Sequence, residues 1–539
     1  MLIVKDLHSD SVYTINMITM FKKWFLPSIA DMLFISVFIY LVLPSNQELL
    51  YDADTGYHIR VGEYILNTLT IPRSDIFSFI EPTIPWTAHE WLSEVIMALL
   101  HRYCDLTAVV IAFSIMIAAS TVLFYKNIVT ECNNVLLAVT ASVMFVVLSN
   151  VHWLARPHIF SLIILLGWYR LLDDFQYRQN NRLWLLPLII ILWVNLHAGF
   201  VIGLAMLFIY FAGNFQLLYT NRKQWEDFGK EKSREFGTIF GVCLIACLAN
   251  PYGYHILIFP FKLIADKYIM DRVGEFLSPN FHQFQPFKYV LYSVVVVFAY
   301  SKQKPNVIET VLVILLTGMS LYSVRYIPLF GVIVIPILLR YIDLDLLRGH
   351  QAVVNFIKKR IENITTVDGM TKGYLWPILC IVVIVLLAAN GVLVHHFNSN
   401  IKPIAALEFI RKNPIAGNMY NNDEFGDCVI YTYSQQYKVF IDGRGDMYGS
   451  ERLREYFSVR EFEPGWQDVI EKYKINWMFI NTDSVLSRYL ILLNDWKLVY
   501  SDKVASIFVK NIPLHESLIG KFPDVKLYGQ KSEAPSNAL

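Results

Sequence analysis

The chain has 539 residues and a formal net charge of +1, and its composition is 55% hydrophobic and 17% charged. With a mean hydropathy of +0.43, it is too apolar for a water-soluble globule. The lack of a basic surplus argues against a nucleic-acid partner. Its six cysteines lie mostly in or beside apolar runs and indicate no disulfide framework. The composition predicts a polytopic protein of the lipid bilayer.

The apolar residues are gathered in blocks close to the ~20 residues that cross a bilayer as a helix. In chain order, about eleven such blocks are predicted as transmembrane helices: 24–43, 106–124, 135–151, 158–172, 183–198, 200–219, 237–250, 288–301, 307–322, 326–342 and 374–395. No cleavable signal pattern precedes the first block, which is long enough to remain as a span. The predicted fold class is a polytopic α-helical membrane protein.

Basic residues fall in alternate loops, and this asymmetry orients the spans. Lys22 and Lys23 place the N-terminus in the cytoplasm. Alternation then places five further basic loops there, which carry Lys126; Arg178 and Arg182; Arg222, Lys223, Lys230, Lys232 and Arg234; Lys302 and Lys304; and Lys358, Lys359 and Arg360. Two long loops, 44–105 and 251–287, and the C-terminus fall outside. The only glycosylation sequon, 363–365, falls inside, which favours a bacterial cytoplasmic membrane.

The composition changes after the last span, so that a transmembrane domain, 1–397, is followed by a soluble extracytoplasmic α/β domain, 398–539. Strands alternating with helices predict a mostly parallel sheet. The predicted strands are 417–421, 438–442, 476–481, 497–501 and 505–510, and the predicted helices are 451–459, 465–473 and 484–494. The run 442–446, Asp-Gly-Arg-Gly-Asp, follows a predicted strand end, where it either binds a ligand or forms a turn.

Two carboxylates, Asp52 and Asp54, stand where the chain leaves the first span. They head a polar segment that also carries His58, Arg60, His89 and Glu90. Carboxylates so placed can take a proton from an acceptor hydroxyl or hold a divalent cation against a phosphate. The alternative is that they are solvated charges that end a helix. Counterparts at the same face further along the chain favour the functional interpretation.

Those counterparts flank later spans on the predicted outer side. Ionisable groups at this depth are retained mainly where they line a cavity or bind something, although a single one is more often a snorkelling or capping residue. With the residues of the first loop, they give a set of candidate substrate-binding residues: His58, Arg60, His89, Glu90, Arg156, His158, His197, Glu275 and Arg325. The candidate ligands of a lipid phosphate are Arg156, Arg325 and His197. Glu275, in the second long loop, is expected to cover the site.

A short N-terminal tail, one span, an outer loop that opens with paired acids, many further spans and an outer C-terminal domain resemble the glycosyltransferase C superfamily. Its members include oligosaccharyltransferase catalytic subunits and protein O-mannosyltransferases. The run 422–426, Asn-Asp-Glu-Phe-Gly, followed by 439–442, is similar to the acceptor-reading region of the former, but the Trp-Trp-Asp motif of that subunit is absent. Recognition of an asparagine sequon is therefore not implied. The stretches 54–63 and 86–94 resemble bacterial multispanning proteins.

This resemblance implies transfer of a sugar from a polyprenyl-phosphate or polyprenyl-diphosphate donor to an extracytoplasmic glycan, lipid or protein. It implies that the carboxylates after the first span, here Asp52 and Asp54, act as catalytic base or metal ligand, with Mg²⁺ or Mn²⁺ as the possible ion. We expect Asp54 to be the base, because it is the second acid and precedes Gly56, which allows close approach, and Asp52 to support it or share a metal. Two alternatives stay open: a transporter or flippase for a lipid-linked saccharide, and a non-catalytic subunit of an assembly complex. A transporter is expected to show broken helices and internal repeats, and no convincing repeat is found.

Overall fold

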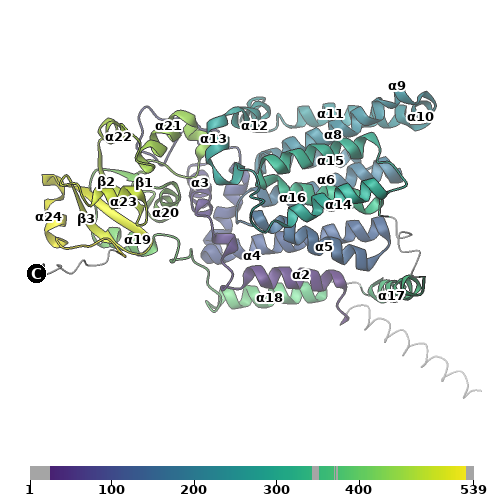
Figure 1. Ribbon diagram of the computed structural model, residues 1–539, viewed down its shortest axis with the longest axis horizontal. Coiled ribbons are helices and arrows are strands. Elements are labelled where there is room, and N and C mark those ends of the chain that lie inside the picture. Colours follow the sequence, from purple (N-terminus) through teal and green to yellow (C-terminus); the bar gives the residue numbers. More distant parts are fainter. Residues whose placement is uncertain (1–24, 343–350, 370, 372–373, 530–539) are drawn as a thin grey trace, which may run out of the picture.

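The computed structural model describes residues 25–342, 351–369, 371 and 374–529. Figure 1 shows the long helices lying side by side in one bundle, with the C-terminal sheet domain at one end and helix α17 (Gln351–Gly369) lying crosswise near the other. Lys22 and Lys23, which carry the prediction for the N-terminus, lie outside the described residues.

Each of the predicted spans coincides with a helix. The helices of the bundle are α2 (Ile29–Val42), α4 (Trp91–Cys132), α5 (Val135–Ser149), α6 (His158–Arg178), α7 (Leu186–Leu196), α8 (Phe200–Phe215), α11 (Lys230–Ala246), α14 (Pro286–Tyr300), α15 (Val307–Tyr322), α16 (Ile327–Arg340) and α18 (Leu375–Ala389). The two long loops also contain helices that the sequence did not predict, namely α3 (Asp54–Thr68), α12 (His255–Ala265) and α13 (Lys267–Arg272).

Within the described part of the chain, three helices are by themselves long and apolar enough to cross a membrane: Trp91–Cys132, Val135–His152 and Phe200–Thr220. Shorter apolar helices of 10–17 residues lie beside them. These helices, which expose many large apolar side chains, fit an integral membrane protein. The number of crossings and their orientation stay predictions. The word outer is kept as a name for loops 44–105 and 251–287, for the adjoining first part of α4 and for the C-terminal domain, after their predicted side.

Helix α4 is broken where the predicted second span begins. Cys104 has φ −155° and Asp105 has φ +46°, so that the helical path bends between an outer part and the apolar part that starts at Leu106. The outer part begins at Trp91, in the segment predicted as a loop. About half of loop 44–105 is therefore helical.

The first span begins with a capping box. The Ser28 hydroxyl accepts a hydrogen bond from the Asp31 N–H, and the Asp31 carboxylate accepts one from the Ser28 N–H. Asp31 also accepts a hydrogen bond at 2.8 Å from the N–H of Tyr374, just before α18. The prediction that Asp31 is a satisfied structural residue is confirmed.

The C-terminal domain contains α19 (Ile404–Lys412), α20 (Asp423–Tyr433), α21 (Gly445–Arg460), α22 (Trp466–Lys472), α23 (Val485–Leu490) and α24 (Glu516–Lys521) around strands β1 (Asn418–Asn421), β2 (Ile475–Asn481), β3 (Trp496–Ser501) and β4 (Ala505–Lys510). The strand order is β1-β2-β4-β3. Only β1 and β2 are parallel, and the other two pairs are antiparallel. The prediction of a mostly parallel sheet was therefore wrong. A tight connection of three residues joins β3 to β4, so these strands form an antiparallel hairpin.

The strand predicted at 438–442 is also absent from the sheet. Its apolar side chains, including Val439 and Phe440, are buried. The backbone of Val439, however, pairs with the first outer loop: its N–H donates to the Phe77 carbonyl at 3.1 Å, and its carbonyl accepts from the Phe79 N–H at 3.4 Å. The segment therefore joins the outer domain to the outer loop.

Helix α3 is packed closely between α4 and α20. A β-carbon on Gly62 would lie 1.9 Å from the Glu94 carbonyl oxygen, and one on Gly56 would lie 2.8 Å from the Tyr431 β-carbon. No larger residue fits at Gly62 without movement of backbone. One hydrophobic core accordingly contains side chains of the outer loop, such as Tyr57, together with those of the C-terminal sheet, such as Phe479.

Candidate active site

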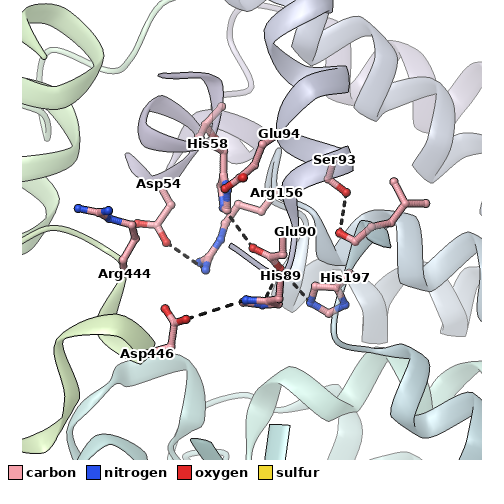
Figure 2. Close-up of polar contacts among 12 residues, drawn as sticks. Asp54, His58, His89, Glu90, Ser93, Glu94, Arg156, His197, Arg444 and Asp446 are labelled. Carbon is pink, nitrogen blue, oxygen red and sulfur yellow. Dashed lines mark hydrogen bonds and ion pairs between the residues drawn. The ribbon is translucent and has the colours of Figure 1, made fainter. Parts of the chain in front are cut away.

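Three carboxylates from two outer loops converge on one guanidinium. Arg156, in the turn before α6, lies with Nη1 2.7 Å from Asp52 Oδ2 and Nη2 3.0 Å from Asp54 Oδ2. Its Nη1 is also 3.4 Å from Glu275 Oε2. Asp54 is the first residue of α3, and its N–H donates to Asp52 Oδ1 at 3.0 Å, which fixes the two acids relative to each other. Figure 2 shows Arg156 reaching toward Asp54.

The two ends of this cluster differ in their electrostatics. Burial raises the pKa of the Asp54 carboxyl well above its usual value, Arg156 opposes this shift, and the charge of Asp52 adds to it. Burial also acts to raise the pKa of Glu275, but Arg325 and Arg156 outweigh it and lower that pKa to about 2. Glu275 is therefore a fixed anion between two arginines, whereas Asp54 can exchange a proton.

A second carboxylate, Glu90, lies among histidines. Its Oε1 is 3.5 Å from His197 Nε2 and 3.6 Å from His89 Nε2, and its Oε2 is 3.9 Å from His58 Nε2. His58 Nδ1 lies 3.2 Å from Glu94 Oε1 on the next turn of α4. Burial raises the pKa of Glu90, and the charges of His89 and Arg156 act against the rise. This array can accept, hold or pass on a proton.

Several polar atoms here are buried without a hydrogen-bond partner in the described structure. They are His58 Nε2, Glu94 Oε2 and Asp446 Oδ2. Buried polar groups are nearly always hydrogen-bonded, and exceptions call for an explanation such as a ligand or water. Because these atoms lie around Glu90, this part of the protein is a candidate binding site.

A cavity of about 200 Å³ opens beside Glu90. Its polar lining includes His89, His158, His197 and Arg325, and its remaining walls are mostly apolar side chains of α6, α8, α12 and α16. The Ser161 hydroxyl lies 2.7 Å from His197 Nδ1 and fixes the ring so that Nε2 faces Glu90. Burial lowers the pKa of His158 and His197, so these imidazoles favour the neutral form. The cavity thus has an imidazole-rich polar head, with Arg325 and Glu90, and an apolar body.

The C-terminal domain supplies part of the site through the run 442–446. Asp446 Oδ2 lies 3.9 Å from His89 Nδ1, and both are labelled in Figure 2. Gly443 lies so close to the acidic cluster that a β-carbon there would be 2.4 Å from Asp54 Oδ1. Arg444 is buried in ion pairs at 2.6 Å with Asp442 and 2.8 Å with Asp75 of the outer loop. The run is both a turn and a wall of the site.

The structure brings most of the predicted residues together. Asp52, Asp54, Arg156, Glu275 and Arg325 form one connected cluster, in which Arg325 Nη1 lies 3.6 Å from Glu275 Oε1. His58, His89, Glu90 and His197 form the adjoining group, and His158 lines the cavity.

Arg60 has other contacts. It donates to the Tyr431 carbonyl at 2.7 Å and pairs with Glu63 at 2.5 Å, so it joins α3 to α20. The predicted site residues did not include Glu94, although it follows Glu90 by about one helical turn. Asp446 was predicted only as part of the run 442–446, which was expected either to bind a ligand or to form a turn.

The carboxylates do not fit a bound divalent cation as they stand. Asp52, Asp54 and Glu275 direct their oxygens at the Arg156 guanidinium, which takes the place between them that a cation would need. Among the described residues, no group of three or more His, Cys, Asp or Glu side chains is placed to hold a metal ion. A divalent cation at Asp52 and Asp54 stays a prediction that requires Arg156 to move.

No family model and no curated protein matches the chain. Solved structures do. The oligosaccharyltransferase AglB from Archaeoglobus fulgidus, in complex with an inhibitory peptide and a dolichol-phosphate, is 12% identical, with a TM-score of 0.51 over 84% of this chain and 69% of that one. The apo form of the Archaeoglobus fulgidus oligosaccharyltransferase is 11% identical, with a TM-score of 0.50 over 89% and 74%. ArnT from Cupriavidus metallidurans, bound to undecaprenyl phosphate, is 10% identical, with a TM-score of 0.48 over 90% and 98%.

At these identities the likeness concerns the fold. The fold is similar to that of the Archaeoglobus fulgidus oligosaccharyltransferase over 84–89% of this chain. The predicted resemblance is confirmed as a likeness of fold. A shared fold carries many functions, so the reaction has to be argued from the site.

Proposed function

We propose that the protein is a membrane glycosyltransferase that transfers a sugar from a polyprenyl-phosphate-linked donor to an acceptor at the face that carries the acidic cluster. One observation carries the proposal: the acid pair Asp52 and Asp54, of which Asp54 is buried, is linked through Arg156, Glu275 and Arg325 to a cavity with a polar head that contains Arg325 and an apolar body. A lipid phosphate has matching parts, because its head group is anionic and its chain is apolar.

The donor would bind with its phosphate at Arg325 and His197, which line the head of the cavity. Arg325 presents a planar fork of donors suited to phosphate oxygens. The beginning of the prenyl chain would lie against the apolar walls. The solved relative with a dolichol-phosphate supports this class of donor.

The reaction is a displacement at the anomeric carbon. The acceptor oxygen or nitrogen forms a bond to this carbon, the bond from the carbon to the donor phosphate oxygen breaks, and the electron pair leaves with the phosphate. Asp54 takes the proton of the acceptor, a role that suits a buried carboxyl with a raised pKa. Arg156 holds Asp54 and Asp52 in place, and Arg325 stabilises the departing phosphate.

Purified protein in lipid vesicles, given a radiolabelled polyprenyl-phosphate sugar and a mixture of glycan, lipid and peptide acceptors, tests the proposal. Transfer or donor hydrolysis that is lost in Asp54→Asn but kept in Asp468→Asn, an exposed acid on α22, is the expected result. Movement of the labelled lipid between leaflets without transfer would instead identify a flippase. Absence of both would leave the role of an assembly subunit.

A further inference from the structure

The imidazole ring of His197 is held on one side by a chain of hydrogen bonds. Its Nδ1 lies 2.7 Å from the Ser161 hydroxyl and accepts a hydrogen bond at 3.0 Å from the Gly199 N–H. The Ser161 oxygen in turn accepts a hydrogen bond at 2.7 Å from the Trp193 indole N–H. Together, Trp193, Ser161 and Gly199 form what we call the imidazole support.

The chemistry of these groups decides which ring nitrogen carries the proton. A backbone N–H and an indole N–H can only donate. Because the Gly199 N–H donates to Nδ1, this nitrogen presents its lone pair and carries no proton. The Ser161 oxygen accepts from the indole, and its own proton is directed at Nδ1. A neutral imidazole whose Nδ1 is unprotonated has its proton on Nε2.

The imidazole support is buried and tightly packed. Trp193 is 1% exposed and Ser161 is 5% exposed. The indole lies edge-on to Trp168, with 5.6 Å between the ring centres, and a β-carbon on Gly203 would lie 2.5 Å from its Cζ3 atom. A β-carbon on Gly199 would lie 2.4 Å from the Ser161 oxygen, so a larger residue there would displace the hydroxyl. A second proton, on Nδ1, would face the Gly199 N–H, so the geometry opposes the imidazolium form.

The other nitrogen of the ring faces the cavity of about 200 Å³ beside Glu90. His197 Nε2 lies 3.5 Å from Glu90 Oε1, and Figure 2 shows the two side chains facing each other. Burial raises the pKa of the Glu90 carboxyl, which limits the negative charge beside the ring. Arg325 lines the same head of the cavity. The Nε2–H group therefore points to the place where the donor phosphate is proposed to bind.

We propose that the imidazole support holds His197 as the neutral tautomer with its proton on Nε2, so that the ring donates a hydrogen bond to a phosphate oxygen of the donor. Trp193, Ser161 and Gly199 are thus positioning residues. The contact with the phosphate rests on the proposed function, whereas the tautomer does not. His197 contributes a hydrogen bond of constant strength to the site, and not a positive charge that depends on pH.

Magic-angle spinning NMR of the full chain in lipid vesicles, labelled with ¹⁵N-histidine, tests the tautomer. His197→Phe assigns the signals, because it removes one of the 13 histidines. Wild-type protein is expected to show an unprotonated Nδ1 and a protonated Nε2 from pH 6 to pH 8. Ser161→Ala should admit the other tautomer, since one donor to Nδ1 is lost. Ser120→Ala is the matched control, because Ser120 is a buried serine of α4 that donates to the Met116 carbonyl.

A protonated Nδ1 in wild-type protein, or protonation of the ring between pH 8 and pH 6, would overturn the proposal. Unchanged His197 signals in a folded Ser161→Ala protein would exclude Ser161 as a positioning residue. Melting temperatures of the variants separate these outcomes from misfolding. The NMR measurements need neither donor nor transfer, so they decide the tautomer even if the protein proves not to be a transferase.

Binding of undecaprenyl phosphate tests the contact with the phosphate. His197→Phe should weaken it about tenfold to a hundredfold, because a hydrogen bond to a charged oxygen is lost. The ratio of the two dissociation constants should stay constant from pH 6 to pH 8. The titratable and charged groups around the ring are the same in both proteins and cancel in this ratio: Glu90, His89, His158, Arg156 and Arg325.

A ratio that rises as the pH falls would show that His197 binds as a cation and would overturn the proposal. Equal affinities of wild type and His197→Phe would overturn the contact with the phosphate. Binding as expected without any transfer would refute the proposed function alone.

Discussion

Two arginines at opposite ends of the helices each hold three carboxylates. Arg340, at the end of α16, lies 2.6 Å from Asp173, 2.9 Å from Glu309 and 3.2 Å from Glu131. Arg156 has three similar partners, at 2.7–3.4 Å. Charge and distance alone do not distinguish the two clusters.

Their surroundings do. The partners of Arg340 come from the ends of α4, α6 and α15, and the cavity beside Asp173 measures only about 10 Å³. The cluster of Arg156 is built from loops and the start of α3, and it adjoins the cavity of about 200 Å³ next to Glu90. Unpartnered buried atoms occur in both clusters, such as Asp173 Oδ1 beside Arg340, so they do not separate the two. A buried ion cluster thus joins helices where it is packed, and becomes a candidate site where a cavity adjoins it.

Removal of the proposed base should have the largest effect. Asp54→Asn is expected to lower turnover ~10²–10⁴-fold, the usual loss for a general base, and Asp52→Asn should lower it less. Glu309→Gln, the matched change in the cluster of Arg340, should leave the turnover of the folded protein unchanged. Initial rates with the radiolabelled donor give the comparison. A folded Asp54→Asn protein with full activity would exclude Asp54 from the mechanism.

Truncation of Arg340 should lower the stability of the folded protein. Arg340→Ala leaves three carboxylates without their cation, and breaking a buried pair in this way costs about 3–5 kcal/mol. Thermal unfolding in detergent should show a lower melting temperature, while the donor affinity of the remaining folded protein stays at the wild-type value. Weaker donor binding at an unchanged melting temperature would contradict a structural role.

The folded protein should lose stability at acid pH because Glu275 becomes protonated. Its pKa of about 2 lies below the ordinary value of 4.5, so the ionised form stabilises the folded state above pH 4.5, and this contribution is lost as the pH falls toward 2. The difference corresponds to about 3 kcal/mol. Melting temperatures from pH 6 to pH 3 should fall less steeply in Glu275→Gln than in wild type. Parallel curves would show that Glu275 does not contribute this dependence.

Arg325→Ala should weaken donor binding about tenfold to a hundredfold, because one charge-assisted contact to the phosphate is lost, and it should lower the melting temperature less than Arg156→Ala, because its one described ion pair is with Glu275. Arg156→Ala should also lower the melting temperature, since Arg156 neutralises three carboxylates. Donor titration and thermal unfolding on the same samples separate the two arginines. A destabilised Arg325→Ala protein with wild-type affinity would refute phosphate binding by Arg325.

Orientation can be tested without any loss of function. Thr70→Cys in the outer loop and Leu492→Cys in the outer domain are exposed, and an impermeant thiol reagent should label both in intact cells. Lys223→Cys at the opposite end should react only after permeabilisation. Protection of position 70 or 492 in intact cells would overturn the predicted topology.

The bundle was predictable because its helices are continuous apolar blocks, and every predicted span matches a helix. Helix α3 was missed because Asp54–Thr68 mixes charged, polar and apolar residues and has no long apolar run. The prediction of a strand at 438–442 was wrong. Val439 is buried, as its apolar side chain indicates, but its backbone pairs with that of Phe77. Periodicity does not reveal such a contact between distant segments.

The candidate site likewise contains some contacts that the sequence predicted and others that it did not. Asp52, Asp54, Arg156 and Arg325 were predictable as a group because the charge pattern of the loops places them at one face. The contact of Asp446 with His89 was not predictable, since it depends on how the outer domain lies against the first loop. Only a folded structure gives that placement.

The close packing of α3 has a mechanical consequence. With no room for a β-carbon at Gly62 or at Gly56, α3 lies directly against α4 and α20. The C-terminal domain also approaches the start of the helix, since a β-carbon on Gly443 would lie 2.4 Å from Asp54 Oδ1. A shift of that domain against α3 would therefore change the surroundings of Asp54 itself.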